Sequence, residues 1–145
     1  MADVQGFAFF CEDFRQEAGN KTSYMGVVGP HMTFEAAPES LPADVSFRLA
    51  KLVAACMAYV PTDEAETAFH VELLMENAPE GVPSRLEQTQ TIPISQKYGR
   101  SMAQFNAQLP GFPVQDGMKV TANFTILGHT FSASVAIDFE RSQTD

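Results

Sequence analysis

The alternating stretch near the C-terminal end limits most strongly what this chain can fold into. From Met118 to Phe139, apolar and polar residues alternate on both sides of Gly128-His129. A period of two places every second side chain on the same face of a strand. Glycine at the first central position is typical of a two-residue type II′ turn. The stretch therefore predicts a long antiparallel hairpin with one apolar face, on which Phe124 and Phe131 are buried.

Most of the remaining chain also has the pattern of strands. Alternation or continuous apolar runs predict strands over residues 6–12, 21–28, 31–35, 52–60, 69–75 and 85–94. Pro93 is typical of an edge strand, whereas residues 43–51 fit either a helical turn or a strand. A lone hairpin is marginal in water, so the other strands are expected to cover its apolar face. We expect a mainly β fold, an antiparallel β-sandwich of about seven to eight strands in one domain over residues 1–145.

One segment has a helical period instead. Its apolar residues recur at i, i+4, i+7 and i+11, as Tyr98, Met102, Phe105 and Leu109. Such a stripe is typical of an amphipathic helix. We therefore expect one short helical insertion, from about Tyr98 to Gln108, that packs against the sandwich.

The proline- and glycine-rich stretch after this segment, Leu109–Val114, is expected to be an exposed loop. Its apolar residues Leu109 and Phe112 are candidates for an interface with a protein partner or with a second copy, because rigid prolines lower the cost of ordering. The alternative is that Phe112 closes the end of its own sandwich. The sequence leaves both interpretations open.

Charge and composition exclude some partners. The formal net charge is −9, which argues against nucleic acid and against anionic membrane surfaces, since both require basic patches. The longest apolar run, residues 52–60, is too short to span a bilayer. No signal peptide is recognised at the N-terminus, so we expect a cytoplasmic protein. Cys11 and Cys56 lie in apolar contexts and are expected to be buried free thiols.

The densest polar cluster beside a predicted strand contains Glu12, Asp13 and Arg15. Two carboxylates near a guanidinium can bind a ligand or perform acid–base chemistry. The alternative is that they form ion pairs that fix the end of a hairpin. The three histidines do not have metal-ligand spacing, and no nucleophile motif or phosphate-binding loop is found. We therefore predict no catalytic residue, no cofactor and no metal.

The N-terminal segment also shows a resemblance. The run Phe10–Glu17 (FCEDFRQE), followed by Gly19–Ser23 (GNKTS) and Gly26-Val27, resembles the opening of an uncharacterised family, a domain of unknown function found in bacteria and some phages. The resemblance covers about a sixth of the chain, by the length of these runs. It implies a compact β-sandwich, and it implies no activity and no site residue.

Two functional hypotheses follow. The first is a non-enzymatic structural or interaction module that works through a protein partner or by self-association. The phage members of the resembled family favour a virion accessory or assembly protein within this hypothesis. The second is a β-sandwich that binds a small ligand or a metal, or an enzyme, with its site at Glu12, Asp13 and Arg15.

Overall fold

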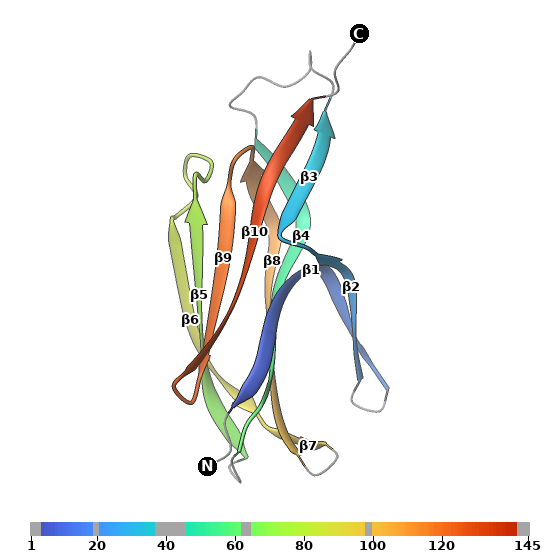
Figure 1. Ribbon diagram of the computed structural model, residues 1–145, viewed down its shortest axis with the longest axis vertical. Coiled ribbons are helices and arrows are strands. Elements are labelled where there is room, and N and C mark those ends of the chain that lie inside the picture. The colour runs from blue at the N-terminus through green and yellow to red at the C-terminus, as the bar shows by residue number, and fades with distance from the viewer. Residues whose placement is uncertain (1–3, 19–20, 37–45, 62–64, 98–99, 142–145) are drawn as a thin grey trace.

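The computed structural model describes residues 4–18, 21–36, 46–61, 65–97 and 100–141. These residues form ten strands and no helix. The strands make two five-stranded sheets that face each other (Figure 1). The predicted mainly β sandwich is therefore confirmed.

Sheet A has the strand order β2-β1-β4-β8-β7, and sheet B has the order β3-β10-β9-β5-β6. The strands of sheet A are β1 (Gln5–Glu17), β2 (Lys21–Val28), β4 (Ser46–Tyr59), β7 (Ser95–Lys97) and β8 (Arg100–Gln115). The strands of sheet B are β3 (His31–Ala36), β5 (Glu66–Glu76), β6 (Arg85–Pro93), β9 (Lys119–Ile126) and β10 (His129–Arg141).

The closing hairpin is β9–β10, but its turn differs from the prediction. His129 pairs with Ile126, so Leu127 and Gly128 are the two turn residues. Both have positive φ, 49° and 78°, which is the conformation of a type I′ turn. The predicted type II′ turn at Gly128-His129 is therefore wrong by one position. A type I′ turn matches the twist of the strands, which is why a leucine is held in the left-handed region here.

Burial along this hairpin follows the number of neighbouring strands. Phe124 is fully buried, as predicted, on a strand paired on both sides. Phe131 is only half-buried, so that part of the prediction is wrong. The reason is that β3 pairs with β10 only from Ala136 onward. Near Phe131, β10 has a paired neighbour on one side only among the described strands.

The shared core between the sheets is built on phenylalanine, as the composition suggests. The rings of Phe69, Phe105 and Phe124 contact one another at centroid distances of 5.8–6.3 Å. Strand β4 is central in sheet A, between β1 and β8. Its residues Leu52–Cys56 are all fully buried, which accounts for an apolar run without alternation. Burial on both faces requires that something also cover the outer face of sheet A.

The expected helical insertion is wrong. Arg100–Gln115 is strand β8, which pairs with β4 from Ser46 to Tyr59; Tyr98 lies outside the described residues. Met102 and Phe105 lie on opposite faces of this strand, because the first borders the outer face and the second belongs to the shared core. Pairing along a whole neighbouring strand overrides a local periodic pattern.

The Leu109–Val114 segment is part of β8 rather than an exposed loop. Gly111 has a φ of 58°, and the strand's alternation changes phase there. As a result Leu109 and Phe112 both face the core, although they are three positions apart. Phe112 is 5% exposed, so it closes the end of its own sandwich.

Within the described residues, we find no helix that is long and apolar enough to cross a membrane.

Candidate functional site on the outer face of sheet A

The hairpin of β1 and β2 bends back over the outer face of sheet A. Its base continues the sheet, with Phe10 paired to Val28. The bend lies at Gly26, whose φ is 64°. This left-handed conformation favours glycine, and the Glu12 side chain lies directly beside the position, with a carboxylate oxygen 2.6 Å from where a β-carbon would be. In Figure 1, β1 rises from the N-terminal end and then turns downward again with β2.

Hydrogen bonds from β2 to β8 fix the bent hairpin in place. The Tyr24 hydroxyl donates to Oδ1 of Asn106 at 2.9 Å, and Nε2 of Gln104 donates to the Tyr24 hydroxyl. Thr22 also contacts Gln104. In the strand order of sheet A, β1 and β4 lie between β2 and β8. These bonds can therefore form only if the hairpin folds over the outer face of β4. Burial raises the pKa of Tyr24.

The bent hairpin covers a second apolar cluster on the outer face. Cys11, Val53 and Ala55 are fully buried there, and the ring of Phe9 meets Tyr24 edge to face at 4.7 Å. The outer half of sheet A is therefore a small core of its own. It completes the burial of β4 on both faces.

The two cysteines are buried free thiols, as predicted. Cys11 pairs with Val53 and lies on the outer face, whereas Cys56 belongs to the shared core. Because they lie on opposite faces of sheet A, a disulfide between them would need a rearrangement of the sheet. Burial raises the pKa of Cys11, and it raises the pKa of Cys56 to about 12, so both thiols stay protonated and unreactive.

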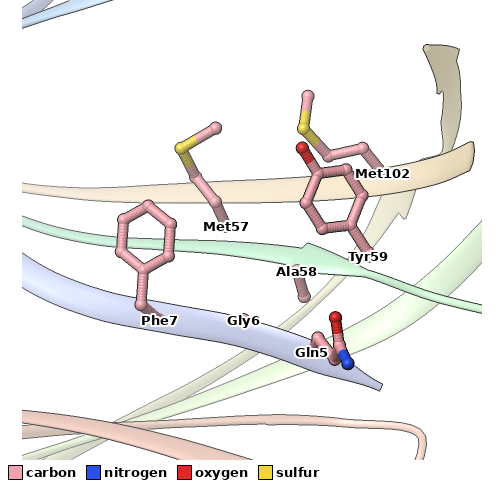
Figure 2. Close-up of a pocket in the computed structure, with 7 residues that line it drawn as sticks. All are labelled: Gln5, Gly6, Phe7, Met57, Ala58, Tyr59 and Met102. Carbon is pink, nitrogen blue, oxygen red and sulfur yellow. The ribbon is translucent and has the colours of Figure 1, made fainter. Parts of the chain in front are cut away.

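Beyond the hairpin, the outer face opens into an apolar groove of about 200 Å³ (Figure 2). The side chains of Phe7, Met57, Tyr59 and Met102 stand along it. Phe7 is 55% exposed and Tyr59 is 43% exposed. We call this surface the outer-face groove, and its lining residues are Gln5, Gly6, Phe7, Met57, Ala58, Tyr59 and Met102.

The floor of the outer-face groove depends on a glycine. A β-carbon at Gly6 would lie 2.5 Å from the carbonyl oxygen of Met57. The two backbones can approach each other here only because Gly6 has no side chain. The stacked rings of Phe7 and Phe9, with centroids 5.7 Å apart, join the groove to the cluster under the hairpin.

The lining of the groove is mostly apolar. Among the described residues that form it, there is no charged side chain and no nucleophile with an adjacent base. Pockets for small molecules usually have about 300–1,000 Å³. The groove is smaller and fits a single large side chain, which is how one anchor residue of a protein partner is bound.

The structure brings Asp13 and Arg15 of the predicted cluster close enough to interact electrostatically. Asp13 binds Nζ of Lys51 at 2.8 Å, and the hydrogen bond from Lys51 lowers its pKa. Glu12 packs against Gly26, and Arg15 is exposed opposite Ser23. The described residues contain no group of three or more His, Cys, Asp or Glu side chains that could hold a metal ion. Ligand binding by Glu12, Asp13 and Arg15 stays a prediction.

The other predicted site residues lie away from the groove. Leu109 is half-buried against the shared core and Phe112 is buried, so neither offers an accessible anchor. Sequence reasoning missed Met57, Tyr59 and Met102. Alternation in the sequence predicts that Phe7, Phe9 and Cys11 share one face of their strand, but it does not tell the inner from the outer face of a sheet.

Comparison with known proteins leaves the family open: no protein-family model matches this sequence, and no curated protein matches it.

Proposed function

We propose that this protein is a non-enzymatic structural or interaction module that assembles with a second copy of itself through the outer-face groove. The observation that carries the proposal is the exposure of Phe7 beside an apolar hollow of side-chain size. Large exposed apolar surface on a soluble domain marks an interaction site. The resemblance of the N-terminal segment to a family with phage members adds assembly in a virion as the setting.

A second copy suits this surface because the protruding Phe7 side chain and the outer-face groove lie side by side. In a two-fold arrangement, each copy places its own Phe7 in the groove of the other. Aromatic side chains in such pockets supply much of the energy of an interface. The groove lining is uncharged, whereas the whole chain carries a formal charge of −9. Contact at this surface therefore brings few like charges together.

The test is the molar mass in solution, measured by light scattering over a concentration series. We expect the wild type to exceed the 15.8 kDa of one chain and to shift further toward the assembled form in higher salt, which screens the repulsion. Phe7→Ser is expected to return the mass to that of the monomer, with an unchanged circular dichroism spectrum.

The matched control is Leu127→Asn, which removes an apolar side chain that is 51% exposed in the β9–β10 turn. This variant should assemble like the wild type. A wild-type protein that is monomeric at every concentration, or a Phe7→Ser variant that assembles normally, would contradict the proposal.

A further inference from the structure

Strand β8 has one edge that is only partly used. Its first edge pairs with β4 over nearly the whole strand. On the other edge, β7 pairs only with Arg100–Met102. Among the strands that the structure describes, none pairs with this second edge beyond Met102. An exposed edge of this kind is a template for another strand.

The orientation of the backbone identifies which groups face the open edge. The amide of Val60, which follows β4, donates to the carbonyl of Ser101 at 2.9 Å, so Ser101 faces β4. Successive residues of a strand direct their N–H and C=O groups to opposite edges. The backbone groups of Gln104, Asn106 and Gln108 therefore face away from β4.

Pro110 is the next residue in this series. A proline is tolerated in a strand where its missing N–H would face an unpaired edge. Its presence agrees with the orientation of the backbone, and it ends the stretch that can donate hydrogen bonds. The usable edge thus runs from Gln104 to Gln108.

Below this edge, strand β6 is exposed along most of its length, and of its residues Ile92 packs against the shared core. Phe105 of β8 contacts Phe69 of β5, and β6 lies one strand beyond β5. Leu86 shares the inner face with its partner Leu73, yet Leu86 is 42% exposed and Leu73 is 4% exposed. Gln88 on the same inner face is exposed too. Sheet B therefore extends one strand further than the part of sheet A above it.

We propose that the Gln104–Gln108 edge of β8 accepts an extended segment of a partner protein, which adds a strand to sheet A above β6. Main-chain hydrogen bonds supply the affinity in this mode of recognition, and alternate side chains supply the specificity. The inner side chains of the segment would lie over β6. The segment should present an apolar side chain toward Leu86 and hydroxyl or amide side chains toward Gln88 and Gln90.

A second whole copy does not fit this edge. If β8 of a second copy paired with this edge, it would lie above β6 of the first copy. The second copy's own β5 lies beneath its β8, so this β5 and β6 of the first copy would occupy the same space. A single extended chain meets no such obstacle, so this site differs in place and in partner from the outer-face groove.

The test uses amide hydrogen exchange by NMR, with the peptide acetyl-Thr-Val-Thr-Thr-Thr-Thr-Thr-amide as the probe, because its second, fourth and sixth residues place one apolar and two hydroxyl side chains on one face. In the free protein, the amides of Gln104, Asn106 and Gln108 should exchange faster than those of Ala103 and Phe105, which face β4. Saturating peptide should slow exchange at the first three by about tenfold or more. The amides that face β4 should change little.

Two variants at Gln108 supply the control. Gln108→Pro removes one N–H at the open edge and leaves the pairing with β4, so the effect of the peptide should be lost. Gln108→Ala keeps the N–H and should respond like the wild type. A third variant, Leu86→Lys, leaves β8 unchanged and should weaken the response, so the proposal can be tested even if Gln108→Pro does not fold.

Three results would overturn the proposal. The first is no added protection of Gln104, Asn106 and Gln108 at saturating peptide. The second is an unchanged response in both Leu86→Lys and a folded Gln108→Pro variant. The third is protection that rises with protein concentration in the absence of peptide, because a second copy would then occupy the edge.

Discussion

The outer faces of the two sheets differ in how they are kept stable next to water. On sheet B, polar side chains bond to one another across the strands: Thr121 meets Ser134 at 3.0 Å, and Ser132 donates to Asn123 at 2.6 Å. On sheet A, the corresponding face is apolar along β1 and β4, and Val53 at its centre is fully buried. A polar sheet face can remain in water, whereas an apolar one needs a cover.

The cover on sheet A is incomplete. The bent β1–β2 hairpin covers Cys11, Val53 and Ala55, and it leaves Phe7 and Tyr59 exposed. The difference between the covered half and the open half is the reason why we propose a partner at the outer-face groove. One half of this apolar surface is covered by the hairpin of the same chain. In our proposal, the other half is covered by a second copy.

The largest expected effect comes from placing a charge on each outer face. Val53→Asp buries a carboxylate under the hairpin, where Lys51, two residues away on the same face of β4, is already paired with Asp13, and should destabilise the protein by about 4 kcal/mol or more. Thr121→Asp puts the same group at a half-exposed position on the central strand of sheet B, near Lys119. It should cost less than about 1 kcal/mol. Urea unfolding followed by circular dichroism measures both. Similar losses for the two variants would mean that the two faces do not differ as described.

A smaller effect is expected where the hairpin is fixed to β8. Tyr24→Phe keeps the ring over Phe9 and removes the hydroxyl that bonds to Asn106 and Gln104. Losing these part-buried hydrogen bonds should cost about 1–3 kcal/mol. Thr125→Val removes a hydroxyl pair on the exposed face of sheet B and should cost less. If Tyr24→Phe is as stable as the wild type in urea, the hydrogen bonds do not hold the hairpin.

The same tyrosine gives the hairpin a dependence on pH. Because burial raises the pKa of Tyr24 in the folded state, its contribution to stability is complete below the ordinary tyrosine pKa. The contribution is lost as the pH rises through the higher, folded-state pKa. Unfolding measured across this alkaline range should show a steeper loss in the wild type than in Tyr24→Phe. Equal slopes would argue against a buried hydroxyl.

The sequence predicted the fold well wherever the residue pattern within a single strand was sufficient to identify that strand. Alternation identified the closing hairpin, and the continuous run at residues 52–60 favoured a strand, although periodicity alone also fits a buried helix. The prediction failed where pairing between distant segments determines the secondary structure. In β8 the apolar residues have a helical spacing, but pairing with β4 makes the segment a strand. The phase change at Gly111 then turned Phe112 inward, which local patterns do not reveal.

The outer-face groove could not be predicted from the sequence for the same reason. Phe7, Met57 and Met102 come from three different strands, and they meet only because β1, β4 and β8 are neighbours in sheet A. The sequence identified the apolar face of β1 but not that it is the outer face. That assignment depends on the bend at Gly26, which carries the hairpin over half of the face.

The most direct measurement is NMR of the protein with labelled methionine methyl groups. Met57 and Met102 line the outer-face groove, whereas Met75 and Met118 are buried in the shared core. If the groove joins two copies, raising the protein concentration should shift or broaden the signals of Met57 and Met102 and leave those of Met75 and Met118 in place. Signals of Met57 and Met102 that stay constant over the whole concentration range would contradict the account.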